Sequence, residues 1–150
     1  MKPYLLIIIF AFSTLISCSS DAIKTSTSLS DEIAKSIITL EEKNYIIDDF
    51  INIGWKKNKK LDNSLFKSTQ GIWYGFYNKR DVEVWIYNSH SDAIENSITY
   101  AEEAINKNPT NKDPTNPTEI RYHAYIVAGN ALILCEDSLE DCKQLISKLK

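Results

Sequence analysis

The stretch of residues 124–135 places the strongest constraint on the fold. Residues 122–128 and 131–135 are the expected arms of a hairpin, both apolar from Ala124 onward, and Gly129-Asn130 between them is a favourable two-residue turn. Successive side chains of a strand point to opposite faces, so both faces of this predicted hairpin are apolar. A strand pair of this kind has to be covered on each side. We therefore expect the hairpin to be central in a β-sheet.

Residues 71–87 predict another hairpin. Its arms, 71–77 and 82–87, are rich in aromatic and β-branched residues, and the four residues 78–81 are the expected turn. Pairing Tyr77 with Val82 divides the side chains between two faces. One face carries Trp73, Gly75, Val82, Val84 and Ile86, and the other carries Tyr74, Phe76, Glu83, Trp85 and Tyr87.

Three helices are expected around these hairpins. The first begins at Thr39, where Thr39 and Glu42 fit a capping box, and ends at Gly54. The second spans residues 92–106 behind Ser91 or Asp92, and the third begins after Ser138. This α-ββα-ββα order predicts an α+β, two-layer domain, with a four-stranded antiparallel sheet and helices mainly on one face.

The amino-terminal residues predict export and a lipid anchor. Lys2 precedes a nearly unbroken apolar run at residues 5–16, which fits a signal peptide and falls short of the roughly 20 residues of a membrane span. Residues 15–18, Leu-Ile-Ser-Cys, match the bacterial lipobox, which implies acylation of Cys18 and cleavage before it. The alternatives are an ordinary signal peptide cut nearby, which would discard Cys18, and a buried core segment.

This assignment divides the chain into three parts. We expect a signal peptide at residues 1–17, a lipidated Cys18 with a polar tether to residue 38, and a single α+β domain at residues 39–150. Cys135 and Cys142 remain, and an even pair in an exported protein suggests a disulfide. The alternative is two free, buried thiols.

Composition argues against several classes of function. The formal net charge of −3 lacks the basic excess of a nucleic-acid-binding protein. Two cysteines seven positions apart and a distant histidine do not give the ligand spacing of a zinc site, and four glycines are too few for a phosphate-binding loop. We expect no metal, no cofactor and no nucleic-acid partner, and the sequence leaves the oligomeric state open.

Two surfaces are candidates for binding. The face with Tyr74, Phe76, Glu83, Trp85 and Tyr87 is either core or, if open, a contact surface for an envelope protein or glycan. The second candidate is either a solvated loop or a contact with anionic lipid headgroups, with the tryptophan at the interface. It consists of Trp55, Lys56, Lys57, Lys59 and Lys60.

From Thr39 onward, the chain resembles small uncharacterised bacterial lipoproteins. The resemblance lies in the order of elements, in Tyr87-x-Ser89 leading into Asp92-Ala93, and in the pattern of residues 125–134. It implies the architecture and adds no chemistry. We therefore expect a lipid-anchored binding or interaction module of the bacterial cell envelope. The alternative is a small exported hydrolase or ligand-binding enzyme whose site is assembled from scattered residues such as His123, Glu83 and Asp137.

Overall fold

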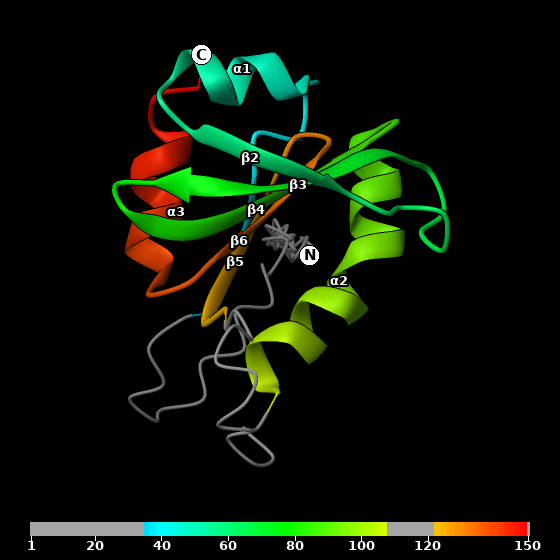
Figure 1. Cartoon of the computed structure of the whole chain (residues 1–150). Helices are drawn as coiled ribbons and strands as arrows, with labels where there is room; N and C mark the ends of the chain where they lie inside the picture. The colour runs from blue at the N-terminus through cyan, green and yellow to red at the C-terminus, as the bar shows by residue number, and fades with distance from the viewer. Residues whose placement is uncertain (1–34, 108–121, 150) are drawn as a thin grey trace, which may run out of the picture. The chain divides into compact units, whose positions relative to one another are not determined.

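The computed structural model describes residues 35–107 and 122–149, which form one six-stranded mixed sheet with three helices (Figure 1). The strands lie in the order β1-β5-β6-β4-β3-β2. Only β1 pairs in parallel, with β5, and every other neighbouring pair is antiparallel. The elements are β1 (Ser36–Thr39), α1 (Ile47–Asn52), β2 (Lys56–Leu61), β3 (Thr69–Tyr77), β4 (Arg80–Tyr87), α2 (His90–Asn106), β5 (Ala124–Ala128), β6 (Ala131–Cys135) and α3 (Leu139–Ile146).

Helices cover both faces of the sheet. Phe50 of α1 and Leu145 of α3 are buried in one hydrophobic cluster, whereas Ala93 and Ala101 of α2 are buried in a second cluster on the opposite face. The expectation of a four-stranded antiparallel sheet with helices mainly on one face is therefore wrong. The described residues form three layers, because the central strands are apolar on both sides.

The predicted central hairpin is confirmed. All ten residues of β5 and β6 are buried, and the pair lies between β1 and β4. Gly129 has a positive φ of +55°, whereas the φ of Asn130 is not positive. This combination is the φ pattern of a type II′ turn. Such a turn matches the right-handed twist of its strands.

The other hairpin has a tighter turn than predicted. Tyr77 pairs with Arg80, and Asn78 and Lys79 have φ values of +50° and +65°, as in a type I′ turn. The observed pairing differs from the predicted one by two residues. Because side chains alternate with a period of two, this shift leaves the predicted division between the two faces unchanged.

The predicted helix from Thr39 is wrong. Residues 36–39 form strand β1, and the helix begins eight residues after Thr39, at Ile47. Its predicted end is confirmed, because Gly54 has a φ of +100° and its N–H donates to the Ile51 carbonyl at 3.0 Å. The N–H of Trp55 donates to the Phe50 carbonyl, also at 3.0 Å, which completes a Schellman motif.

Two further sequence assignments change at the edges of the sheet. The lysine-rich segment after Trp55 is edge strand β2 and not a loop. Residues 36–38, expected in the tether, belong to β1 at the opposite edge. The signal peptide, Cys18 and the tether up to residue 34 lie outside the described residues.

The two longer helices begin at side-chain caps. Ser89 Oγ accepts a hydrogen bond from Asp92 N at 3.1 Å, so α2 begins two residues earlier than predicted. Ser138 caps α3 as predicted, with its Oγ accepting from Asp141 N at 3.4 Å. α2 then runs across the face of β4, β6 and β5 (Figure 1).

Candidate functional site

A cleft of about 710 Å³ lies beside the carboxy-terminal half of α2. The sheet contributes Glu83 and Trp85 from β4 and Leu134 from β6, and Tyr122 precedes β5. The helix side contributes Tyr100, Glu103, Ala104, Asn106 and Lys107. The volume lies within the range of small-molecule sites, and the lining combines aromatic groups with a few ionisable ones.

Glu83 is the polar centre of this cleft. It lies on the face of β4 that carries the α2 cluster, opposite Tyr74 of β3 and Leu134 of β6. Trp85 Nε1 donates a hydrogen bond to Glu83 Oε1 at 2.5 Å, and the Tyr122 hydroxyl donates to Oε2 at 3.0 Å. These two bonds hold each carboxylate oxygen in place.

Burial raises the pKa of Glu83 above its ordinary value. The hydrogen bonds from Trp85 and Tyr122 oppose this effect because they stabilise the carboxylate, and so does the positive charge of Lys59. The environment of Glu83 therefore leaves the charge of this carboxylate incompletely compensated. A polar group that converges with apolar walls in a cleft is typical of a binding site.

Two aromatic rings that line the cleft, those of Trp85 and Tyr100, are supported by a third ring outside the lining. Phe66, in the β2–β3 connection, packs edge-on against Trp85 with ring centroids 4.6 Å apart and against Tyr100 at 4.9 Å. Tyr100 on α2 is nevertheless 45% exposed. The Tyr100 ring is therefore both fixed by its neighbours and accessible from the cleft.

The five residues of the predicted aromatic face lie on one face of the sheet but differ in burial. Trp85 and Tyr87 are buried in the α2 cluster, so this end of the face is core. Tyr74 and Phe76 are half-buried and contact each other with ring centroids 5.2 Å apart. The Tyr74 hydroxyl donates to Asp81 Oδ1 at 2.6 Å, and burial together with this bond raises the pKa of Tyr74 to about 12.

Only Glu83 and Trp85 of the predicted five therefore line the cleft. Sequence reasoning missed Tyr100, Glu103 and Tyr122. Tyr100 is not among the buried residues of α2, and Tyr122 precedes the first strand of the apolar hairpin. A polar Glu83 among apolar strand neighbours was the signal present in the sequence.

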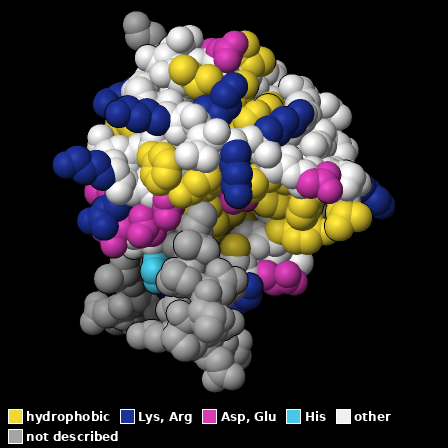
Figure 2. Space-filling view, viewed as in Figure 1, with side chains coloured by type: hydrophobic (Ala, Val, Ile, Leu, Met, Phe, Trp, Pro, Cys, Tyr) yellow, Lys and Arg dark blue, Asp and Glu magenta, His cyan; other side chains and the backbone are white. Residues whose placement is uncertain are grey.

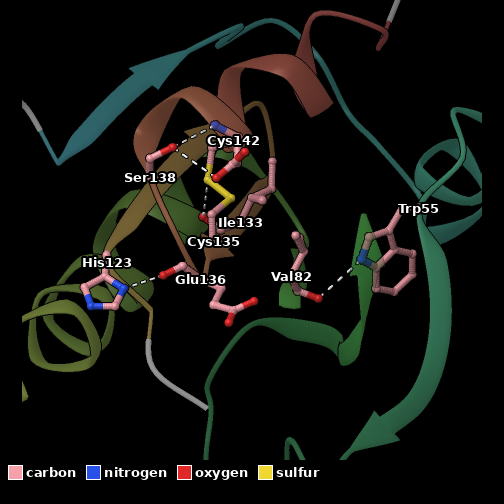
Figure 3. The surroundings of a disulfide bond; sticks show 9 residues. Trp55, Val82, His123, Ile133, Cys135, Glu136, Ser138 and Cys142 are labelled. Carbon is pink, nitrogen blue, oxygen red and sulfur yellow. Dashed lines mark hydrogen bonds between the residues drawn. A yellow bond between two sulfur atoms is a disulfide. The ribbon is translucent and has the colours of Figure 1, made fainter. Parts of the chain in front are cut away.

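The residues of the predicted membrane surface also differ in burial: Trp55 is buried, and the four lysines are exposed. Trp55 is 1% exposed, and its Nε1 donates to the Val82 carbonyl at 3.3 Å (Figure 3). A Cβ at Gly75 would come within 2.7 Å of the Trp55 ring, so this glycine makes room for it. The expectation that Trp55 lies at a lipid interface is wrong, because the side chain belongs to the core.

The four lysines of that set are exposed along β2. Lys and Arg side chains are spread over the side of the molecule on which β2 lies (Figures 1 and 2). The register of β2 with β3 shifts between Lys57 and Lys59. Lysines and an irregularity of this kind on an edge strand prevent pairing with the edge of another sheet. This gives the lysine run a structural role, and contact with lipid remains a prediction.

His123, Glu83 and Asp137, the three residues suggested for an enzyme site, each contact different partners among the described residues and not one another. His123 Nδ1 is hydrogen-bonded to the Glu136 backbone carbonyl (Figure 3). Asp137 forms an exposed ion pair with Arg80 at 3.2 Å, and Glu83 is bonded to Trp85 and Tyr122. Within residues 35–107 and 122–149, no group of three His, Cys, Asp or Glu side chains is arranged to hold a metal ion.

The structure contains the predicted disulfide. Cys135 at the end of β6 is bonded to Cys142 in α3, with their Cα atoms 5.9 Å apart (Figure 3). Both residues are buried, at 1% and 0% exposure, as in the alternative of two free, buried thiols, and it is the bond between their sulfur atoms that distinguishes the two arrangements. The bond joins α3 to the sheet on the face opposite the cleft.

The model of a family of unknown function (DUF6810) matches residues 46–116. This range includes α1, β2, β3, β4 and α2, and so the Glu83, Trp85, Tyr100 and Glu103 side of the cleft. Tyr122 and Leu134 lie outside the matched range. No curated protein and no solved structure matched the chain. Among the described helices, none combines the length and apolar character that crossing a membrane requires.

Proposed function

We propose that this chain is a lipid-anchored binding module of the bacterial cell envelope, and that its ligand site is the cleft between α2 and the sheet. The observation that carries the proposal is the Glu83 carboxylate, held by two hydrogen bonds at a cleft of about 710 Å³ with aromatic walls. Such a combination orients a small ligand through the polar group and binds it through the apolar walls.

The proposed anchor rests on the sequence of the first 18 residues. A diacylglycerol on the Cys18 thiol, with a further acyl chain on the new amine, would supply the two or more chains that stable attachment requires. The domain would then work on the extracytoplasmic side of a membrane, close to its surface. An envelope protein or glycan whose exposed group enters the cleft fits this placement.

A binding role is favoured over catalysis by the residue types at the cleft. Among its described lining residues there is no histidine, cysteine, serine or threonine. Among these described lining residues, Glu83 therefore has no serine, threonine or cysteine side chain for which it could act as a base. The hydrogen bonds that Trp85 and Tyr122 donate to the carboxylate fix its position, which suits recognition.

The two parts of the proposal are tested separately. For the anchor, cells are labelled with radioactive palmitate; we expect label in the chain and none in Cys18→Ala. Label that persists in the variant would contradict lipidation at Cys18.

For the cleft, the full chain in non-ionic detergent is screened against small aromatic fragments by ligand-observed NMR. We expect Tyr100→Ala to weaken the hits at least several-fold, because the half-exposed ring lines the cleft. The matched control is Ile38→Ala, since Ile38 is similarly exposed, at 48% against 45%, but lies on β1 at the sheet edge. Equal effects of the two variants on every hit would refute the cleft as the ligand site.

A further inference from the structure

We infer that the ligand group bound in the cleft is an organic cation, an ammonium or guanidinium group on an apolar stem, with Glu83 as its counter-ion. This inference rests on the proposed function, because it names the ligand class of the same site. Three observations on the described residues support it: the charge of the lining, the hydrogen bonds to Glu83 and the aromatic walls.

The charge of the lining favours a cation. The described lining residues include two carboxylates, Glu83 and Glu103, and one amine, Lys107. Outside the cleft, Lys59 on β2 attracts the Glu83 carboxylate, yet no ion pair joins the two within the described residues. Partial burial of a carboxylate is costly, and a cationic ligand would reduce that cost.

Among the described residues, two hydrogen bonds to Glu83 leave further acceptor positions on its carboxylate. An ionised carboxylate has about four acceptor positions on its two oxygens. Trp85 Nε1 occupies one on Oε1, and the Tyr122 hydroxyl occupies one on Oε2. The remaining positions suit the N–H donors of an ammonium or guanidinium group, and a charge-assisted bond of this kind is stronger than a neutral one.

The aromatic side chains that line the cleft also favour a cation. Trp85, Tyr100 and Tyr122 line the cleft around Glu83. Aromatic faces attract cations through their quadrupole, most strongly for tryptophan, and they also bind the apolar stem of the ligand. A carboxylate among aromatic rings therefore selects a positive group with an apolar attachment.

The test compares three compounds with nearly the same skeleton and different charge. 2-Phenylethylamine is the cation, 2-phenylethanol the neutral analogue and 3-phenylpropanoate the anion. Affinities for the full chain in non-ionic detergent are measured by calorimetry, and chitobiose is added as a glycan probe. We expect the amine to bind at least tenfold more tightly than the alcohol and the anion to bind most weakly.

Glu83→Gln should abolish this preference, by lowering the affinity for the amine to about that for the alcohol. The matched control is Glu95→Gln, an exposed carboxylate on α2 that does not line the cleft, which should keep the preference. If Glu83→Gln fails to fold, Tyr122→Phe serves instead. It keeps the carboxylate but removes one of its donors, and we expect the preference for the amine to persist.

The pH dependence gives a second readout. Protonation of Glu83 would remove the counter-ion, so the affinity for the amine should fall as the pH is lowered through the raised pKa of Glu83. The alcohol should show no such fall. Among the described residues, the charged groups around Glu83 are Lys59, Asp81, Glu103 and Lys107, and the loss of the effect in Glu83→Gln assigns it to Glu83.

The outcomes separate the inference from the proposed function. Equal affinities for amine and alcohol, a preference that survives Glu83→Gln, or preferential binding of chitobiose would overturn the inference while leaving the cleft as a ligand site. A failure of every compound to bind, together with no fragment hit sensitive to Tyr100→Ala, would overturn both.

Discussion

Replacement of the buried Asn130 by alanine should strongly destabilise the protein. Asn130 lies in the β5–β6 turn and is 2% exposed. Its Oδ1 accepts from the Tyr45 N–H at 2.5 Å, and its Nδ2 donates to the carbonyls of Tyr45 at 3.1 Å and Tyr87 at 2.9 Å. One amide side chain thus fastens the segment before α1 to the central hairpin and to the end of β4.

The expected loss follows from counting the groups left without a partner. In Asn130→Ala, the Tyr87 carbonyl still accepts from Gln70 Nε2 at 3.3 Å. The N–H and carbonyl of Tyr45 have no other hydrogen bond among those described in residues 35–107 and 122–149. A buried backbone group that loses its partner costs about 1–3 kcal/mol, so two such groups should lower the free energy of unfolding by about 4 kcal/mol.

Urea denaturation followed by tryptophan fluorescence measures this loss, with the disulfide kept oxidised. The midpoint should fall while the slope m stays unchanged, because the folded state is the same. The matched control is Asn58→Ala on the exposed edge strand β2, which should change the stability by less than about 0.5 kcal/mol. A loss of less than about 1 kcal/mol in Asn130→Ala would show that Tyr45 finds other partners, and our count would be refuted.

Four other perturbations test separate parts of the structure. Gly129→Ala should cost about 2 kcal/mol in thermal melts, because its φ is +55° and the new Cβ would lie 2.2 Å from the Lys43 carbonyl oxygen. Replacing Cys135 and Cys142 together by alanine should cost about 2.5 kcal/mol from loop-closure entropy; an unchanged midpoint would contradict this. Changing all four lysines of β2 to glutamine should reduce cosedimentation of the unacylated Cys18→Ala chain with anionic vesicles; unchanged binding would refute lipid contact. Ultraviolet titration should show one phenol near pH 12 that is lost in Tyr74→Phe, and the contribution of Tyr74 to stability, fully present below pH 10, should be lost as the pH rises through about 12.

Local sequence patterns were sufficient to predict that the two hairpins exist, where α1 ends and which residue caps α3. Each depends on residues close together in the sequence, such as Gly129-Asn130 in a two-residue turn or Ser138 before a helix. The disulfide was also within reach, because the predicted lipidation of Cys18 would leave an even pair of cysteines. In these cases the tertiary structure agrees with the local preference.

The two edge strands could not be predicted by the same reasoning. β2 is exposed at every position except Leu61, so it has no apolar alternation by which a strand is recognised. β1 has only four residues and is a strand through its parallel pairing with β5, almost ninety positions further along. The competing capping pattern at Thr39–Glu42 is local, and the pairing with a buried central strand outweighs it.

The cleft could not be predicted from local patterns, because elements far apart in the sequence form it. Its residues come from β4, α2, β6 and the segment before β5, and only the path of α2 across the sheet brings them together. The sequence nevertheless contained one mark of the site. Val82, Val84, Trp85, Ile86 and Tyr87 of β4 are all buried, and Glu83 interrupts them with a carboxylate whose burial raises its pKa. A leucine at position 83 would satisfy the strand pattern without that cost. Departures from local rules are expected where function demands them, so the misfit of Glu83 is itself an argument that the cleft binds a ligand.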